Sequence, residues 1–162
     1  MVNKLTKVVK NIELGLGVFF ITIFFITIVI QVFSRYLGIS VMWTGEVSTY
    51  SFTWSVFMGA GVMTYENKHF AFNSLIEKLT GNKKESLKIF ISFVILVFSA
   101  AIFYYGVIIT RKFWNYRWIT LPKVKMGYTW LCVPIMGVTS ILYSLDHILG
   151  YVNNIRKRGI SQ

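Results

Sequence analysis

The sequence is poor in charged residues, and poorest in acidic ones. Only 14% of its 162 residues are charged, whereas soluble domains carry roughly 25%. Hydrophobic residues make up 55% of the chain, and 17 Lys and Arg stand against 6 Asp and Glu. A soluble domain of this length needs more polar surface than this composition provides. The sequence therefore predicts an all-α integral membrane protein and no soluble catalytic domain.

The residues used for catalysis, disulfides and metal binding are also scarce. The single cysteine, Cys132, excludes an internal disulfide. Hydrolase or transferase chemistry needs a nucleophile with a base, or a metal site, but the only histidines are His69 and His147. We expect no enzymatic activity, no metal and no cofactor. A haem held between the two histidines is an alternative, although both lie at predicted membrane boundaries, where a polar interfacial role is favoured.

Long apolar runs divide the chain into a single membrane domain, residues 1–162. Four stretches of about 20 residues can each cross a hydrocarbon core of about 30 Å as a helix. They are residues 12–33, 43–63, 89–110 and 126–145. We interpret the first as a retained span, since it is longer than a signal-peptide core and no small-residue cleavage site follows. Residues 68–82 alternate apolar and polar positions at helical spacing, which predicts an amphipathic helix at the membrane interface.

The distribution of basic residues predicts an orientation. With the amino terminus in the cytoplasm, the inner segments hold eleven Lys and Arg and the outer segments hold six. This difference favours both termini inside, because basic residues collect in cytoplasmic loops. Basic residues beside membrane spans also attract phospholipid head groups. We expect phospholipid contacts and no nucleic-acid binding, because no basic platform interleaved with aromatic residues lies outside the spans.

Charged residues at the first connection between spans require an explanation. Glu46 is the carboxylate that we single out within the spans, and Arg35 precedes it by eleven residues. An ion pair between them would make both charges tolerable at the interface. Aromatic residues around Glu46 recur at steps of three and four, which places them on one helical face, and Gly59 lets another helix come close. The predicted contact residues are Arg35, Trp43, Glu46, Tyr50, Trp54 and Gly59.

A lone glutamate in a small four-span protein also suggests a different function. Small multidrug antiporters exchange protons for cations through one intramembrane glutamate. The chain would then be a self-sufficient proton-coupled antiporter that uses Glu46. In those proteins the glutamate lies deep in the first span, whereas Glu46 is only three residues past Trp43, near the start of the second predicted span.

Three motifs resemble a known family. They are "FSRY" at 33–36, "WTGEVSTYSFTWSVFMGAG" at 43–61 and "KHFAFNSL" at 68–75. Their order and spacing are similar to those of the small membrane subunit (the Q component, DctQ-like) of tripartite ATP-independent periplasmic (TRAP) transporters. His69, which opens the connector in that pattern, joins the predicted contact residues. The chain departs from the pattern at Tyr65 and Glu66, where a basic residue is common, and at Asn73, where an Asp is common.

The resemblance implies a non-catalytic subunit of a secondary transporter. In this family a large membrane subunit carries the substrate and sodium sites, and a periplasmic binding protein delivers an organic acid. The small subunit packs against the large one, about one to one, and enlarges its scaffold in the bacterial inner membrane. Overall likeness favours sialic acid among the family's substrates. The residues agree with a scaffold, because transport sites need broken helices and several converging polar groups.

Overall fold

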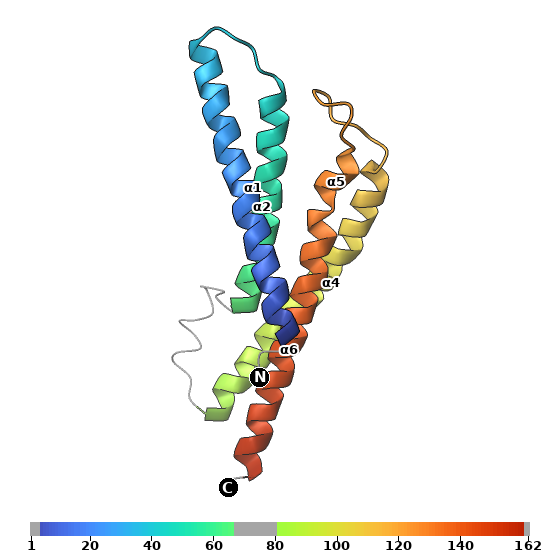
Figure 1. Cartoon of the computed structure of the whole chain (residues 1–162). Coiled ribbons are helices and arrows are strands. Elements are labelled where there is room, and N and C mark those ends of the chain that lie inside the picture. Colours follow the sequence, from blue (N-terminus) through green and yellow to red (C-terminus); the bar gives the residue numbers. More distant parts are fainter. Residues whose placement is uncertain (1–3, 67–80, 161–162) are drawn as a thin grey trace.

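The computed structural model describes residues 4–66 and 81–160, with the side chains of 81–83 and 157–160 left aside. This part of the chain is helical apart from its connectors, as predicted. Figure 1 shows the helices in chain order. They are α1 (Lys4–Tyr36), α2 (Trp43–Glu66), α4 (Gly81–Phe113), α5 (Met126–Trp130) and α6 (Cys132–Ile160).

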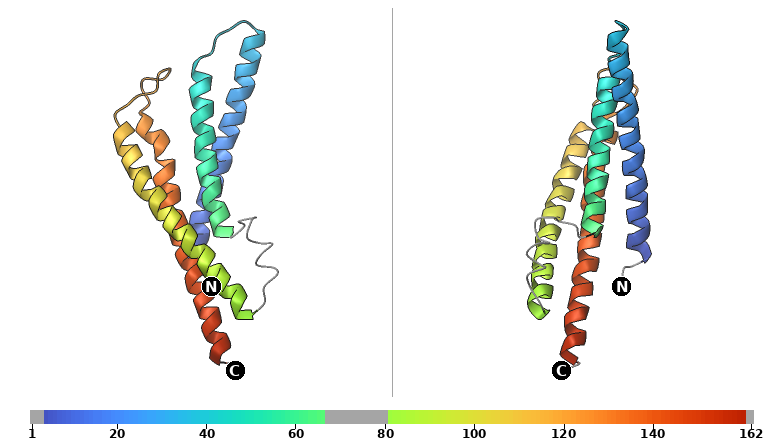
Figure 2. Two further views of the ribbon diagram at one scale, coloured as in Figure 1. Left: turned by 180° about the vertical axis from the view of Figure 1, so that it is seen from behind. Right: turned by 90° about the vertical axis from the view of Figure 1, so that its left-hand side faces the viewer.

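The helices form two antiparallel pairs that diverge toward one end of the molecule. α1 packs along α2, α4 packs along α6, and α2 and α6 make the main contact between the pairs. Residues 37–42 and 114–125 connect helices at the end where the pairs diverge, and both chain termini lie at the opposite end (Figure 1). We call these the loop end and the terminal end. Figure 2 shows from behind and from the side that the molecule is long and thin.

Three helical segments are long and apolar enough to cross a membrane. They are Lys4–Tyr36, Lys84–Phe113 and Met126–Arg156. The second predicted span forms α2, whose 24 residues reach about 36 Å, but its many Ser, Thr, Gly, Trp and Tyr residues keep it out of this group. The chain is therefore a multi-pass membrane protein, and its count of four spans stays a prediction. The predicted amphipathic helix at 68–82 lies almost entirely outside the described residues.

A seven-residue spacing of small residues brings α4 close to α6. Ser92, Ser99 and Gly106 of α4 are buried, and a Cβ added at Gly106 would lie 2.9 Å from Val133. On α6, a Cβ added at Gly137 would lie 2.8 Å from the Phe103 backbone. Small residues at helix contacts allow such close approach in membranes, where dispersion rather than the hydrophobic effect holds helices together. The small residues therefore let the backbones of α4 and α6 pack in close contact.

Pro134 explains why the fourth predicted span is divided between two helices. Proline has no amide hydrogen, so the carbonyl four residues earlier, that of Trp130, loses its helical partner. The Thr110 hydroxyl of α4 donates to this carbonyl at 3.1 Å. The interruption therefore leaves no unpaired acceptor at this site, as an apolar environment requires. The boundary between α5 and α6 lies at Leu131, three residues before Pro134.

Candidate functional site

Glu46 lies in the first turn of α2 and binds the connector 114–125. Its carboxylate accepts hydrogen bonds from the backbone amides of Ile119 at 2.9 Å and Thr120 at 2.8 Å. The Thr120 hydroxyl donates to the same carboxylate. Hydrogen bonds to a charged acceptor are roughly twice as strong as neutral ones. Glu46 therefore fastens the α1–α2 pair to the α4–α6 pair at the loop end.

The connector is shaped to present these two amides. The Trp118 amide donates to the Val124 carbonyl at 3.1 Å, and the Met126 amide donates to the Tyr116 carbonyl at 2.8 Å. These bonds fold residues 116–126 back on themselves, with Ile119 and Thr120 near the tip. The Ile119 and Thr120 amides are not paired within this fold-back. The Glu46 carboxylate therefore provides the acceptor that these two backbone donors require.

The predicted ion pair between Arg35 and Glu46 is wrong. Both Glu46 oxygens are occupied by the connector, and Arg35 is exposed at the end of α1, beside a small hollow that includes Gln31 and Ser40. Backbone amides hold a carboxylate without the entropy cost of ordering a long arginine side chain. Arg35 thus stays at the loop end without joining the two helix pairs.

The aromatic residues predicted beside Glu46 also face their own chain. Tyr50 packs on Trp118 of the connector, with ring centroids 4.6 Å apart. Trp54 stacks on Phe20 of α1 at 4.9 Å, and its indole nitrogen donates to the Tyr128 carbonyl at 3.2 Å. The structure therefore brings Glu46, Tyr50 and Trp54 together on one face of α2, as their spacing predicts, and this face binds the connector, α1 and α5.

The other predicted contact residues are placed differently. Trp43, the first residue of α2, is 40% exposed at the loop end. Gly59 faces open space, with no atom within 4 Å of an added Cβ. It lines a groove of about 300 Å³ between α1 and α2, together with Gly17 and Ser55. His69 lies outside the described residues. An outside partner therefore has access to Trp43 and Gly59, and neither is needed to hold the two helix pairs together.

A second carboxylate, Glu13, was missed from sequence. Glu13 of α1 is only 2% exposed. It accepts hydrogen bonds from the Thr139 hydroxyl at 2.6 Å and from the Tyr143 hydroxyl at 2.7 Å, both on α6. The signal was available, because Glu13 falls inside the first apolar stretch and Thr139 and Tyr143 are one helical turn apart. An intramembrane carboxylate deserves a functional hypothesis by default.

Gly61 of α2 makes room for Glu13. A Cβ added at Gly61 would lie 2.6 Å from one carboxylate oxygen and 2.9 Å from the other. Three helices therefore meet at this carboxylate: α1 supplies it, α6 supplies two donors and α2 supplies space. The close approach at Gly61 is therefore a contact within the chain.

Glu13→Gln tests this contact with little change in volume. Glutamine keeps one oxygen acceptor but replaces the second with a donor, which cannot accept from Thr139 or Tyr143. We expect a loss of about 1 kcal/mol in stability, since polar contacts between membrane helices contribute roughly that much. The measurement is the temperature at which the monodisperse peak of the detergent-solubilised chain is lost. A Glu13→Gln chain as heat-stable as wild type would contradict the assignment.

The family described as "Tripartite ATP-independent periplasmic transporters, DctQ component" matches residues 16–153, which covers α2, α4 and α5 and most of α1 and α6. The chain belongs to the DctQ family. No individual curated protein matches it in the corresponding search. The match includes Glu46 and its partners at 119 and 120, whereas Glu13 lies just before it.

Membership of the DctQ family fixes the coarse function. The chain is a small membrane component of a TRAP transporter, and the family implies association with the other components of such a transporter. The resemblance in the three sequence motifs is thereby confirmed. Within the described residues, no three His, Cys, Asp or Glu side chains come together as metal ligands would. The polar contacts that this DctQ-family chain does contain join its own helices.

Proposed function

We propose that this DctQ-family chain is a non-catalytic scaffold for the large permease subunit of a sodium-coupled, binding-protein-dependent organic acid transporter. The observation that carries the proposal is the way two carboxylates, Glu13 and Glu46, are used. Glu13 and Glu46 both accept hydrogen bonds from their own chain. A carboxylate occupied in this way supports a rigid body better than it supports binding of a cation or proton in transit.

The positions of the two carboxylates suit a scaffold. Glu46 and Gly61, which touches Glu13, are fifteen residues apart on α2, or roughly 22 Å along the helix. The two helix pairs are therefore joined near both ends of α2. Such a body resists bending and offers a fixed surface to a partner that moves during transport.

The membrane arrangement that fits this function has four spans and both termini in the cytoplasm. α2 is long enough to cross and packs between α1 and α6, which supports its inclusion as a span. The loop end then faces the periplasm, in keeping with the smaller number of basic residues in the outer segments. In this arrangement the predicted amphipathic segment 68–82, which lies almost entirely outside the described residues, would be cytoplasmic. Phospholipids surround the remaining apolar surface.

The large subunit is the source of substrate and ion specificity in this proposal. It carries the sodium and organic acid sites, binds the small subunit about one to one, and receives substrate from a periplasmic binding protein. Sialic acid is the substrate class that overall sequence likeness favours. Trp43, at the start of α2, and His69, outside the described residues, remain contact residues of the proposal.

Gly59→Leu tests the partner surface. Because there is open space above Gly59, the isolated variant should still fold. The added leucine side chain would prevent a helix of the large subunit from packing closely there. We expect the yield of the two-subunit complex to fall about tenfold, which corresponds to roughly 1.4 kcal/mol. Quantitative pull-down through a tag on this chain measures it. Gly15→Leu, also in open space but outside the groove, is the control, and equal loss in both would count against this groove.

Co-purification from native membranes tests the proposal as a whole. A large polytopic membrane protein recovered at about equal stoichiometry is the expected result. Reconstitution in liposomes tests the function of the isolated chain. This chain alone should give no proton-coupled or sodium-coupled transport. Transport by the chain alone that is lost in Glu46→Gln would overturn the scaffold and establish the antiporter.

A further inference from the structure

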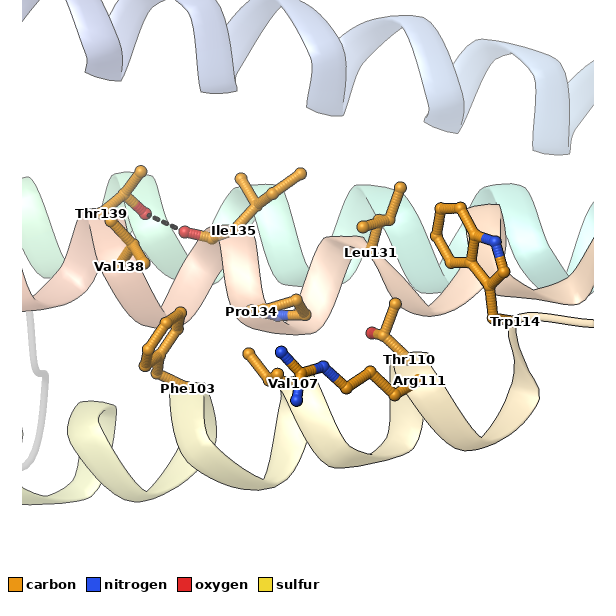
Figure 3. A pocket seen from close by; sticks show the side chains of 10 residues that line it. All are labelled: Phe103, Val107, Thr110, Arg111, Trp114, Leu131, Pro134, Ile135, Val138 and Thr139. Atoms are coloured by element: carbon orange, nitrogen blue, oxygen red, sulfur yellow. Dashed lines mark hydrogen bonds between the residues drawn. The ribbon is translucent and has the colours of Figure 1, made fainter.

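An apolar groove follows the seam between α4 and the α5–α6 segment. It has a volume of about 520 Å³ and ten lining residues. Figure 3 shows that the α4 side chains and the α6 side chains face each other across it. The lining residues are Phe103, Val107, Thr110, Arg111, Trp114, Leu131, Pro134, Ile135, Val138 and Thr139. Their character is apolar along the groove and cationic only at Arg111.

The dimensions of the groove suit a single hydrocarbon chain. From Phe103 to Arg111 it runs for eight residues of α4, or about 12 Å, most of the roughly 15 Å depth of one leaflet. Its walls are two directly packed helices. Helix axes in such pairs are about 8 to 10 Å apart, and a third helix with side chains is about 10 Å wide. The seam therefore admits a flexible chain more readily than a helix of a partner protein.

Among the groups that line the groove, Arg111 carries the only charge. The Thr139 hydroxyl donates to Glu13, and the Thr110 hydroxyl donates to the Trp130 carbonyl. Arg111 is exposed in the last turn of α4, at the loop end. Among residues 4–66 and 81–160, no carboxylate forms an ion pair with it at 4 Å or less. The groove thus combines an apolar body with one cation that comes from the loop end, and Figure 3 shows its guanidinium directed along the groove toward Val107.

Trp114 marks that end as the level of the lipid head groups. It lines the groove beside Arg111 and contacts Tyr128, with ring centroids 5.7 Å apart. Tryptophan and tyrosine gather at the boundary between hydrocarbon and water. A guanidinium is well suited to bind a phosphate through paired hydrogen bonds.

We propose that this groove is a binding site for one glycerophospholipid of the leaflet at the loop end. One acyl chain lies between α4 and α6 along Phe103, Val107 and Val138, and the lipid phosphate binds Arg111. The inference does not depend on the scaffold function, since it needs only a chain that crosses the membrane. It assigns to Arg111 a partner that the described part of the chain does not supply.

Photo-crosslinking in native membranes identifies the occupant directly. A diazirine amino acid is placed at Val138 of the full chain, which is 40% exposed in the groove. After irradiation in cells, intact-mass spectrometry should show an adduct with the mass of a phospholipid. The same amino acid at Val94, 50% exposed on α4 outside this groove, should give at least about tenfold less of it. A polypeptide adduct at Val138, or equal lipid adducts at both positions, would overturn the proposal.

Lipid retention separates the phosphate contact from the acyl contact. The purified chain is titrated with dioleoyl phosphatidylglycerol or with dioleoylglycerol, which lacks the phosphate, and native mass spectrometry counts bound lipid. Wild type should prefer phosphatidylglycerol, and Arg111→Gln should bind it about fivefold more weakly. Lys112→Gln, the neighbouring cation outside the groove, should not change binding. Equal losses in the two variants, or no preference in wild type, would refute the role of Arg111.

Discussion

Gly61→Leu is expected to destabilise the isolated chain more than any other single change considered in these helices. The new side chain would collide with the Glu13 carboxylate, because even a Cβ would lie 2.6 Å from its nearer oxygen. Either α1 and α2 separate or Glu13 loses its contacts with Thr139 and Tyr143. Overpacking costs up to about 3 kcal/mol, to which the loss of two buried hydrogen bonds adds. We expect a fall of about 10 °C in the apparent melting temperature in detergent.

Gly59→Leu is the matched control for this experiment. It lies two residues away on the same helix, and its Cβ would meet no atom within 4 Å. The isolated Gly59→Leu chain should therefore melt like wild type. Equal melting temperatures for Gly61→Leu and wild type would show that α2 does not press on Glu13.

Glu46→Ala is expected to release the connector 114–125 from α2. The change removes the acceptor of the Ile119 and Thr120 amides and of the Thr120 hydroxyl. Hydrogen bonds to a charged group contribute about 1.5 to 3 kcal/mol each, so amide exchange at 119 and 120 should accelerate by at least about tenfold. Hydrogen–deuterium exchange of the chain in detergent measures this directly. The proposed complex with the large subunit should also be recovered in lower yield.

Glu46→Gln separates the charge from the hydrogen bonds. Its amide oxygen can still accept from one of the two backbone amides, so its exchange rates should fall between those of wild type and Glu46→Ala. Protection at 119 and 120 that is unchanged in Glu46→Ala would mean that the connector is held by Trp118 and its contact with Tyr50, and that Glu46 is dispensable for the fold.

The apolar runs of the sequence predicted where helices occur but not where they end. The first run, 12–33, lies within α1, which extends from Lys4 to Tyr36, and the third, 89–110, lies within α4, which begins at Gly81. Hydropathy detects the part of a helix that enters lipid, whereas the helix continues into the polar flank until its hydrogen bonding stops. The break at Leu131 required tertiary information, because Thr110 of another helix compensates for Pro134.

The contacts between helices were harder to predict than the helices. Arg35 and Glu46 are close in sequence and opposite in charge, which favoured an ion pair, but the backbone of a distant connector satisfies Glu46 instead. Such a partner has no side-chain signature. By contrast, Glu13 and the small residues at 92, 99 and 106 were visible as a carboxylate in an apolar run and as a regular seven-residue spacing. Those two signals could have been found without the structure.

The composition of α2 has a consequence for the biogenesis of the protein. Its hydroxyl groups at 48, 49, 53, 55 and 64 donate to carbonyls of their own helix, which lowers their cost in lipid but adds little driving force for entry. Because α2 gains little free energy from entering the bilayer alone, its insertion depends on the neighbouring helix. If α2 crosses the membrane as proposed, the translocon would have to release α1 and α2 together as a hairpin, and α1, the more apolar partner, would carry α2 into the bilayer.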